Sequence, residues 1–468
     1  MSPLESPPGS GAGPGSVPGP GAGGALLVQG GTVLTLDTAA AVVRADVMVA
    51  GGRIAAIGDG LAPPPGARRL DAADAFVLPG LVQGHLHLGQ TFFRGLAEGR
   101  RLLPWLRERI WPLEAAHDDE SAYWCGLLGA AECLLGGTTT VQDIGLGPGI
   151  RGLLDALVES RLRALAGQCL MDGGDGLPAP LAGDAESVLG ATASLGDRYD
   201  GAGGGRLRYL LNPRFILSCS DPLWRGVREL SLARGWPVHT HALEQREESA
   251  AVRATHGGRD EIEYFDDTGL LGTDLRLAHG VWISAAHRRR LRSGRISVVH
   301  CPSSNLKLGS GIADLVALRR AGLAVGIGAD AAACNNRLDA FEELRLAALL
   351  QSLRRGPGAF SGLDALRLAT SEGARALGLG DSIGSVEVGK AADLLVLSRR
   401  QPQLTAAAAV DPHDLIAFGA SPAAVRHVVV GGEVLVEDGR LTRLDLDEIR
   451  RHAQRTLAGL LARSGLAL

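Results

Sequence analysis

The stretch GLVQGHLHLGQTFFRG, residues 80–95, places His85 and His87 one residue apart at the end of an apolar run. Residues i and i+2 of a strand face the same side of a sheet, so both imidazoles can reach one metal ion. Two polar side chains at the point where a strand meets solvent would give the same pattern. A metal site therefore requires further ligands from other parts of the chain.

Short β-rich runs alternate with longer helical stretches from about residue 75 onward. This alternation is typical of parallel βα units, and eight strands match the size of a (β/α)8 barrel. A doubly wound open sheet would alternate in the same way, but it gives no reason for polar residues at so many strand ends. We predict an α/β fold with a distorted TIM-like barrel. The predicted strands are 75–88, 138–145, 162–171, 207–216, 236–243, 275–283, 296–303 and 324–331.

The segments that flank the barrel, predicted at 75–384, differ from it in pattern. Residues 25–74 and 385–440 contain short alternating runs with Gly-Gly turns, which are typical of antiparallel hairpins. We predict that both blocks form one small β-sandwich domain, followed by a C-terminal helix within 441–468. Residues 1–24 are mostly Gly, Pro, Ser and Ala, and without the basic region of a signal peptide they predict a disordered tail.

The composition predicts a soluble globular protein. A hydrophobic content of 46% and a net charge of −4 give no electrostatic basis for binding nucleic acid or a membrane surface. No apolar run reaches the roughly 20 residues of a membrane span. The six cysteines contain no CxxC pair, which is typical of reduced thiols in a cytoplasmic protein.

Metal-ligating side chains gather at the predicted strand ends, where barrel enzymes carry their chemistry. Six of the 12 histidines lie there, together with one aspartate. Any one of these histidines alone is better explained as a hydrogen-bonded core residue, but that explanation does not account for the joint pattern. These residues are His85, His87, His239, His241, His279, His300 and Asp330.

Three of these histidines and the aspartate form a candidate ligand set. His85, His87, His241 and Asp330 offer three nitrogens and one oxygen and leave a position open for water, as in a catalytic zinc site. His239 competes with His241, but Glu244 follows His241 by three residues and can reach a metal-bound water as a proton shuttle. We therefore predict His241 as the ligand and a deeper, supporting position for His239.

The lysines indicate one metal ion rather than two. Two-metal sites in such barrels commonly need a carboxylated lysine on the fourth strand, and residues 207–216 contain none. The HxE and PCxxC signature of another zinc-deaminase class is absent. The sequence predicts one divalent ion per subunit, with Zn²⁺ favoured and Fe²⁺ as the alternative.

Several longer motifs together resemble the amidohydrolase superfamily over residues 25–440. Within it, the chain is similar to the branch of S-adenosylhomocysteine, 5-methylthioadenosine and 5'-deoxyadenosine deaminases, with triazine chlorohydrolases and guanine deaminases as more distant relatives. The motifs are PGLVQGHLHLGQTFFRGLAE, GGTTTVQDIG, HTHALEQREE, HCPSSNLKLGSG, GADAAACNNRLDAFEELRLAALL and SIGSVEVGKAADLLVL.

The resemblance implies a hydrolytic deaminase in which a zinc hydroxide attacks the amino-bearing ring carbon of an adenosine-type nucleoside. It implies that Asp330 is both ligand and base, that Glu244 protonates the ring nitrogen, and that His279 hydrogen-bonds the attacking oxygen. Glu114, in the sequence WPLE, matches the position that binds ribose hydroxyls. The product is the inosine analogue with release of ammonia, and the resemblance also favours a homo-oligomer.

Two positions depart from the pattern of this branch. Arg214, in NPRF, replaces the histidine of adenosylhomocysteine-type enzymes and is closer to the 5'-deoxyadenosine type, so contacts with the substrate are expected to differ. Ala331 replaces a glycine after the aspartate, which is expected to shift the geometry without abolishing metal binding.

Two other functions are compatible with a barrel of this kind. A hydrolase of s-triazines or another aminated heterocycle is the main alternative, although Glu244 and Glu114 argue against it because a triazine has no ribose. A catalytically inactive scaffold is the other, but such proteins typically lose metal ligands, and here the whole set is present.

Overall fold

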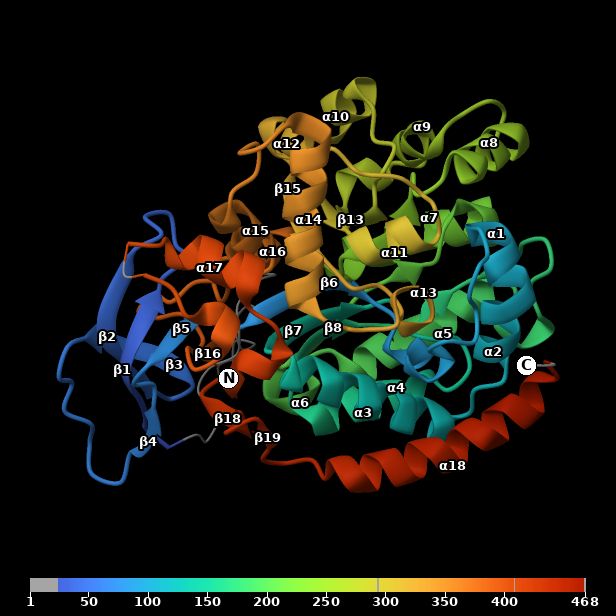
Figure 1. Cartoon of the computed structure of the whole chain (residues 1–468). Coiled ribbons are helices and arrows are strands. Elements are labelled where there is room, and N and C mark those ends of the chain that lie inside the picture. Colours follow the sequence, from blue (N-terminus) through green and yellow to red (C-terminus); the bar gives the residue numbers. More distant parts are fainter. Residues whose placement is uncertain (1–23, 293, 408, 467–468) are drawn as a thin grey trace, which may run out of the picture.

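The computed structural model describes residues 24–292, 294–407 and 409–466, so the predicted tail lies outside the described residues except for Gly24. The chain has a mixed α/β fold, as predicted, in which strands from both ends of the chain lie beside a larger part rich in parallel strands and helices (Figure 1). No helix among the described residues is long and apolar enough to cross a membrane.

One nine-stranded sheet contains strands from both ends of the chain, in the order β19-β18-β17-β16-β5-β1-β2-β3, with β4 beside β1. The two halves meet where β16 pairs antiparallel with β5. The terminal blocks thus share a sheet, while their arrangement as a two-layered sandwich stays a prediction. The strands are β1 (Leu26–Leu34), β2 (Val42–Ala50), β3 (Arg53–Gly58), β4 (Arg68–Asp71), β5 (Ala75–Pro79), β16 (Leu394–Ser398), β17 (Val425–Val430), β18 (Glu433–Glu437) and β19 (Arg440–Leu441).

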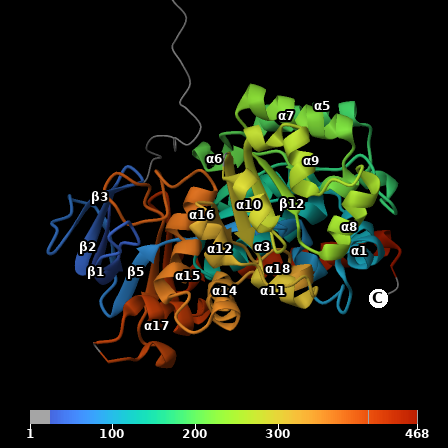
Figure 2. The same cartoon turned by 90° about the horizontal axis from the view of Figure 1, so that it is seen from above.

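Two four-stranded parallel sheets, β10-β8-β7-β6 and β12-β13-β14-β15, occupy the middle of the chain. Isolated parallel bridges link their outer strands, between Leu86 and Asp330 at one edge and between Leu211 and Val238 at the other. Helices surround these strands in the view from above (Figure 2). The strands of these sheets are β6 (Leu81–Leu86), β7 (Thr138–Asp143), β8 (Arg163–Ala166), β10 (Leu207–Tyr209), β12 (Val238–Ala242), β13 (Asp274–His279), β14 (Arg295–His300) and β15 (Ala324–Ile327). Two short strands, β9 (Cys169–Leu170) and β11 (Asn212–Pro213), form a separate parallel pair.

The predicted first strand, 75–88, is divided between two sheets. Residues 75–79 form β5 in the terminal sheet, and β6 begins the parallel part at Leu81. Between them, a Cβ atom on Gly80 would lie 2.1 Å from the Thr139 side chain, so only glycine lets the backbone pass this closely. The apolar run is therefore continuous in sequence but not in the sheet.

The helices are mostly amphipathic and cover the strands. In α18 the buried residues recur at helical spacing, and its N-cap Asp445 accepts hydrogen bonds from the backbone of Asp447 and Glu448. The predicted C-terminal helix is thus present, and it runs along the outside next to α3 (Figure 1). The helices are α1 (Leu102–Trp105), α2 (Trp111–Ala115), α3 (Asp119–Leu135), α4 (Ile150–Ser160), α5 (Ala185–Tyr199), α6 (Ala202–Gly205), α7 (Asp221–Arg234), α8 (Arg246–Thr255), α9 (Glu261–Asp267), α10 (Ala285–Leu291), α11 (Pro302–Lys307), α12 (Leu315–Arg320), α13 (Ala332–Asn335), α14 (Ala340–Arg355), α15 (Gly362–Leu368), α16 (Ser371–Ala376), α17 (Pro412–Gly419) and α18 (Leu446–Ser464).

A buried ion pair joins the terminal sheet to the parallel strands. Arg163 in β8 donates two hydrogen bonds, of 2.8 and 3.0 Å, to Asp393 just before β16. Both side chains are at most 5% exposed. Because a buried charge without a partner is very unfavourable, this pair ties the position of one sheet to the other.

We expect Asp393→Ala to lower the free energy of unfolding by about 3–5 kcal/mol, because it leaves Arg163 buried without its partner. Urea unfolding followed by circular dichroism measures this change. The double variant Arg163→Met/Asp393→Leu removes both charges and is expected to recover most of the stability. A single variant as stable as the wild type would show that water reaches Arg163.

Candidate active site

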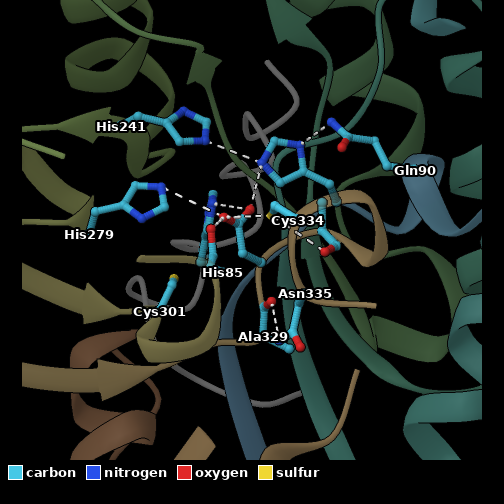
Figure 3. A network of polar contacts seen from close by, with 12 residues as sticks. His85, Gln90, His241, His279, Cys301, Ala329, Cys334 and Asn335 are labelled. Carbon is cyan, nitrogen blue, oxygen red and sulfur yellow. Dashed lines mark hydrogen bonds and ion pairs between the residues drawn. The ribbon is translucent and has the colours of Figure 1, made fainter. Parts of the chain in front are cut away.

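The four predicted metal ligands converge on one point. His85 Nε2 and His87 Nε2 each lie 3.3 Å from Asp330 Oδ1, and His87 Nε2 lies 3.2 Å from His241 Nε2. In Figure 3, His241 and His279 extend from one side of the site toward its centre, and Gln90 lies on the other side. The donor atoms fall into two overlapping groups, each within 4.8 Å, that share His85. These groups are His85, His87 and His241, and His85, His279 and Asp330.

Backbone hydrogen bonds place the predicted ligands from β6 and from the residues after β15 side by side. Asp330 N donates to His85 O at 3.1 Å, and His87 N donates to Asp330 O at 3.4 Å. A Cβ atom on Gly328 would lie 2.4 Å from His85 O, so a glycine is needed for the two chains to approach. Asp330 itself has a φ of 60°, an uncommon conformation for a residue other than glycine and one that often marks functional sites.

The protonation states in the site suit metal binding. Burial lowers the pKa of His85 and holds the pKa values of His87 and His241 well below their usual range, so all three imidazoles are neutral at neutral pH. Burial alone would raise the pKa of Asp330, but the neighbouring histidines, His85 first, hold it well below its usual range. Three neutral nitrogens and one carboxylate are the donor set of a divalent metal site.

One buried atom tests whether a metal fits. His85 Nε2 is inaccessible to solvent and has no hydrogen-bond partner among the described residues, although it faces Asp330 Oδ1. Buried polar atoms in proteins nearly always have a partner. A single metal ion at the centre of the cluster fits this orphaned nitrogen and the other three donors.

His239 lies behind His85 rather than beside the other donors. Its Nε2 is 2.7 Å from His85 Nδ1, and its Nδ1 is 3.0 Å from the backbone carbonyl of Arg276. His241 instead directs Nε2 toward His87 and bonds the Arg214 carbonyl through Nδ1, at 2.6 Å. This geometry supports the prediction of His241 as the ligand and of a supporting position for His239.

Glu244 and His279 lie together at the edge of the ligand cluster. Glu244 Oε2 is 3.4 Å from His279 Nε2, which lies 3.9 Å from Asp330 Oδ2. Asn305 Oδ1 faces His279 Nδ1 at 3.0 Å, and Ser310 Oγ donates to Glu244 Oε1 at 3.0 Å. Burial raises the pKa of Glu244, which favours the protonated carboxyl, a form that can donate a proton.

The two predicted substrate-binding residues, Glu114 and Arg214, bind each other. Arg214 Nη1 donates to Glu114 Oε2 at 2.6 Å, and both side chains are 3% exposed. Gln90 Nε2 donates to Glu114 Oε1 at 2.7 Å and lies 3.1 Å from His87 Nδ1, so the ion pair connects to a predicted ligand. Arg214 lines the cavity beside the predicted metal ligands, whereas Glu114 is not among its lining residues. Their contact with a substrate stays a prediction.

A largely apolar wall closes this cavity, and the sequence did not predict it. Helix α1 and the following turn of π-helix, Leu106–Ile110, cover one side, and short π-helical turns are frequent at functional sites. The sequence motifs indicated only Glu114 in this region, although the dense run of Leu and Trp before it is a pattern that could have predicted an apolar wall. The apolar lining residues are Leu102, Trp105, Leu106, Phe215 and Leu308.

Other supporting residues also went unrecognised in the sequence. Ser304 Oγ donates to Asp330 Oδ2 at 2.6 Å, and Cys334 Sγ lies 3.2 Å from the same oxygen. Both residues lie in motifs that resemble the family, but their roles depend on contacts between distant segments. His300 was grouped with the strand-end histidines and lies outside both groups of donor atoms. Ala331 has a φ of −98°, so the missing glycine causes no backbone strain.

Comparison with known proteins agrees with this site. The Amidohydrolase family model matches residues 76–435. A 5-methylthioadenosine/S-adenosylhomocysteine deaminase of Halobacterium salinarum is 38% identical over 94% of this chain and 99% of its own length. A 5'-deoxyadenosine deaminase of Methanobrevibacter smithii is 33% identical over 89% of this chain and 94% of its own. The solved structure of an adenosine deaminase from Xanthomonas campestris with bound zinc has a TM-score of 0.86 at 30% identity, covering 93% of this chain and 98% of that one.

The chain belongs to the amidohydrolase family, whose members are metal-dependent hydrolases. The resemblance seen in the sequence motifs is thereby confirmed. Within the family, the similarity to deaminases of adenosine-type nucleosides, which the motifs also indicated, is confirmed by relatives of those names.

Proposed function

We propose that this protein is a hydrolytic deaminase of adenosine-type nucleosides, converting them to the inosine analogue and ammonia. The observation that carries the proposal is the convergence of three neutral histidines and Asp330 beside the protonatable Glu244 at one cavity. The names of its relatives, 5-methylthioadenosine/S-adenosylhomocysteine deaminase and 5'-deoxyadenosine deaminase, supply the substrate class.

The residues of the site divide the chemistry among them. A zinc ion, held by His85, His87, His241 and Asp330, would lower the pKa of a water molecule at its open position. Asp330 takes a proton from the attacking water, and Glu244 donates one to the ring nitrogen beside the amino-bearing carbon. Asp330 then gives its proton to the amino group, which leaves as ammonia, while the new hydroxyl returns a proton to Glu244 as the carbonyl forms. With Nδ1 facing Asn305 Oδ1, His279 turns Nε2 toward this space and hydrogen-bonds the attacking oxygen.

The cavity favours a small, uncharged 5' substituent. Its wall of Leu, Trp and Phe suits a methyl or methylthio group, which gains from leaving water. Arg214 is the only cation among the described residues that line it, and Glu114 already neutralises that charge. The carboxylate of a homocysteine substituent therefore has no free partner there, and we place 5'-deoxyadenosine and 5-methylthioadenosine ahead of S-adenosylhomocysteine.

The remaining architecture is part of the proposal. The eight parallel strands, linked at both edges by isolated bridges, would form the distorted (β/α)8 barrel over residues 75–384. Residues 25–74 and 385–440 would form the small β-sandwich domain around their shared sheet. The bridges support closure of the barrel, and the strand ends that carry the ligands then meet at one opening.

We also propose a cytoplasmic homo-oligomer with no nucleic-acid partner. All six cysteines, which lie within the described residues, are free and buried, as expected in a reducing compartment. The net charge of −4 gives no attraction for a polyanion. Exposed apolar side chains on two helices that pack together, Leu349 and Leu353 of α14 and Phe418 of α17, support contact between subunits.

Ammonia release from a panel of substrates tests the function. We expect kcat/KM to be highest for 5'-deoxyadenosine and 5-methylthioadenosine and at least about 10-fold lower for S-adenosylhomocysteine, because its charged tail is desolvated without a partner. Guanine and a chlorotriazine serve as the arms for the alternative function and should give no turnover. Turnover of guanine or the chlorotriazine faster than that of the nucleosides would overturn the proposal. A preference for S-adenosylhomocysteine would overturn the inference on the 5' substituent.

A further inference from the structure

A chain of hydrogen bonds leads from the orphaned nitrogen of His85 to the backbone of a neighbouring strand. His85 Nδ1 lies 2.7 Å from His239 Nε2, and His239 Nδ1 lies 3.0 Å from the carbonyl oxygen of Arg276. Both imidazoles are fully buried. We propose that His239 is a positioning residue that selects the tautomer of His85 and so presents its Nε2 lone pair to the metal ion.

The Arg276 carbonyl, at the end of this series of hydrogen bonds, determines which ring nitrogens of His239 and His85 carry a proton. A carbonyl oxygen only accepts hydrogen bonds, so His239 Nδ1 carries the proton that it donates to Arg276. A second proton on His239 would create a buried cation, and the hydrogen-bond partners of its ring include no carboxylate. His239 Nε2 is therefore an acceptor, and His85 Nδ1 must be the donor. The remaining nitrogen, His85 Nε2, then holds a lone pair on the side of the predicted metal position, 3.3 Å from Asp330 Oδ1.

The reverse arrangement would leave unfavourable contacts in a dry interior. With Nδ1 of His85 unprotonated, two nitrogen lone pairs would face each other across 2.7 Å, or His239 would point a lone pair at the Arg276 carbonyl. Each case loses a buried hydrogen bond, which costs about 1–3 kcal/mol. That penalty is enough to hold most His85 side chains in the tautomer that binds metal.

The carbonyl that fixes the chain is itself held in place. Arg276 lies opposite His239 in the paired strands β13 and β12. Its guanidinium donates to Gln142 Oε1 at 2.7 Å, and Gln142 Nε2 donates at 2.8 Å to the carbonyl of Gly84, the residue before His85. Arg276 thus supports His85 in two ways. Its guanidinium, through Gln142, holds the backbone before His85, and its carbonyl, through His239, holds the His85 ring.

In a second predicted ligand, His241, a backbone carbonyl sets the tautomer directly, without a histidine between them. His241 donates its Nδ1 proton directly to the Arg214 carbonyl at 2.6 Å, which leaves Nε2 for the metal. At His85 the partner of Nδ1 is the ring of His239, which passes the hydrogen bond on to the Arg276 carbonyl. This comparison explains why a histidine, with a donor on one side and an acceptor on the other, occupies position 239.

Two variants of nearly equal size and shape separate this role from packing. His239→Gln keeps an oxygen that accepts from His85 Nδ1, whereas His239→Met has a side chain of the same length without that acceptor. We expect His239→Met to weaken Zn²⁺ binding about 10–100-fold, and His239→Gln to bind within a few-fold of wild type. Competition with a chromophoric chelator on the full-length apo-protein measures the dissociation constant, and thermal unfolding of the apo-proteins checks that each variant folds.

Several results would overturn the inference. Zinc affinity of a folded His239→Met variant equal to wild type would do so, as would equal weakening in both variants, which would indicate packing alone. If His239→Met does not fold, nitrogen NMR of the ¹⁵N-histidine-labelled wild type gives the answer, because His85 and His239 must each carry the proton on Nδ1. The inference rests on the proposed metal site, but its measurement is metal binding. A protein that binds zinc as expected yet deaminates no nucleoside would contradict only the proposed function.

Discussion

Replacing Glu244 with glutamine is expected to lower kcat by about 100-fold or more while leaving the metal content unchanged. Glu244 lies 3.4 Å from His279 and is not one of the donor atoms grouped around His85, so its loss removes a proton donor and not a ligand. Glutamine has nearly the same shape and can still accept the hydrogen bond from Ser310. Steady-state ammonia release with 5'-deoxyadenosine, together with metal analysis of the purified variant, measures both quantities.

The pH dependence of kcat gives a second, independent test of Glu244 as the proton donor. Burial raises the pKa of Glu244, so its acid form persists to higher pH than that of an ordinary glutamate. Activity that needs this proton falls as the pH rises through the raised pKa, and that alkaline decline should disappear in Glu244→Gln. Glu247→Gln, on the exposed start of α8, is the matched control and should behave as wild type. Normal turnover of Glu244→Gln with metal retained would remove Glu244 from the proton path.

Local patterns in the sequence were enough to predict the parallel strands and the gathering of histidines at their ends. A βα unit repeats its period within a few tens of residues, and strand ends in such folds lie at one edge, so histidines at those ends were expected to meet. The distances between His87, His241 and Asp330 agree with that expectation. The division of 75–88 at Gly80 could not be predicted in this way, because it depends on close contact with Thr139, far along the chain.

The supporting hydrogen bonds of the site were beyond the reach of pattern analysis for the same reason. The link between Glu114 and Arg214 joins residues 100 positions apart, and each of them alone resembled a substrate contact. In the folded protein each is the neutralising partner of the other. A substrate hydroxyl would therefore have to displace one partner of this ion pair, whose N–O distance is 2.6 Å, or form a hydrogen bond to the pair without separating it.

The ion pair between Glu114 and Arg214 is connected to the histidines of the site. Gln90 connects Glu114 to the ring of His87, and the carbonyl of Arg214 holds the ring of His241. The two residues predicted to contact the nucleoside are thus also linked by hydrogen bonds to two of the predicted metal ligands. Substitution of either is expected to change metal affinity and substrate affinity together, so neither measurement alone assigns its role.

Removal of the metal is expected to abolish deamination, with a loss greater than about 1,000-fold, because no other group in the site can generate a strong nucleophile from water at neutral pH. Dialysis against a chelator followed by ammonia assays measures the loss. Adding back Zn²⁺, Fe²⁺ or Mg²⁺ in separate samples then identifies the ion. Nitrogen-rich sites favour the first two, whereas Mg²⁺ prefers oxygen ligands and should not restore activity.

The same experiment has a stability reading that does not depend on turnover. A ligand that binds only the folded protein stabilises it by about 4 kcal/mol at a concentration 1,000-fold above its dissociation constant, so the melting temperature should fall on chelation and recover with the active ion. His85 Nε2, buried without a partner, would then regain the contact that the described protein atoms do not provide. Full activity after exhaustive chelation, with an unchanged melting temperature, would mean that the three histidines and Asp330 serve the fold and not a metal.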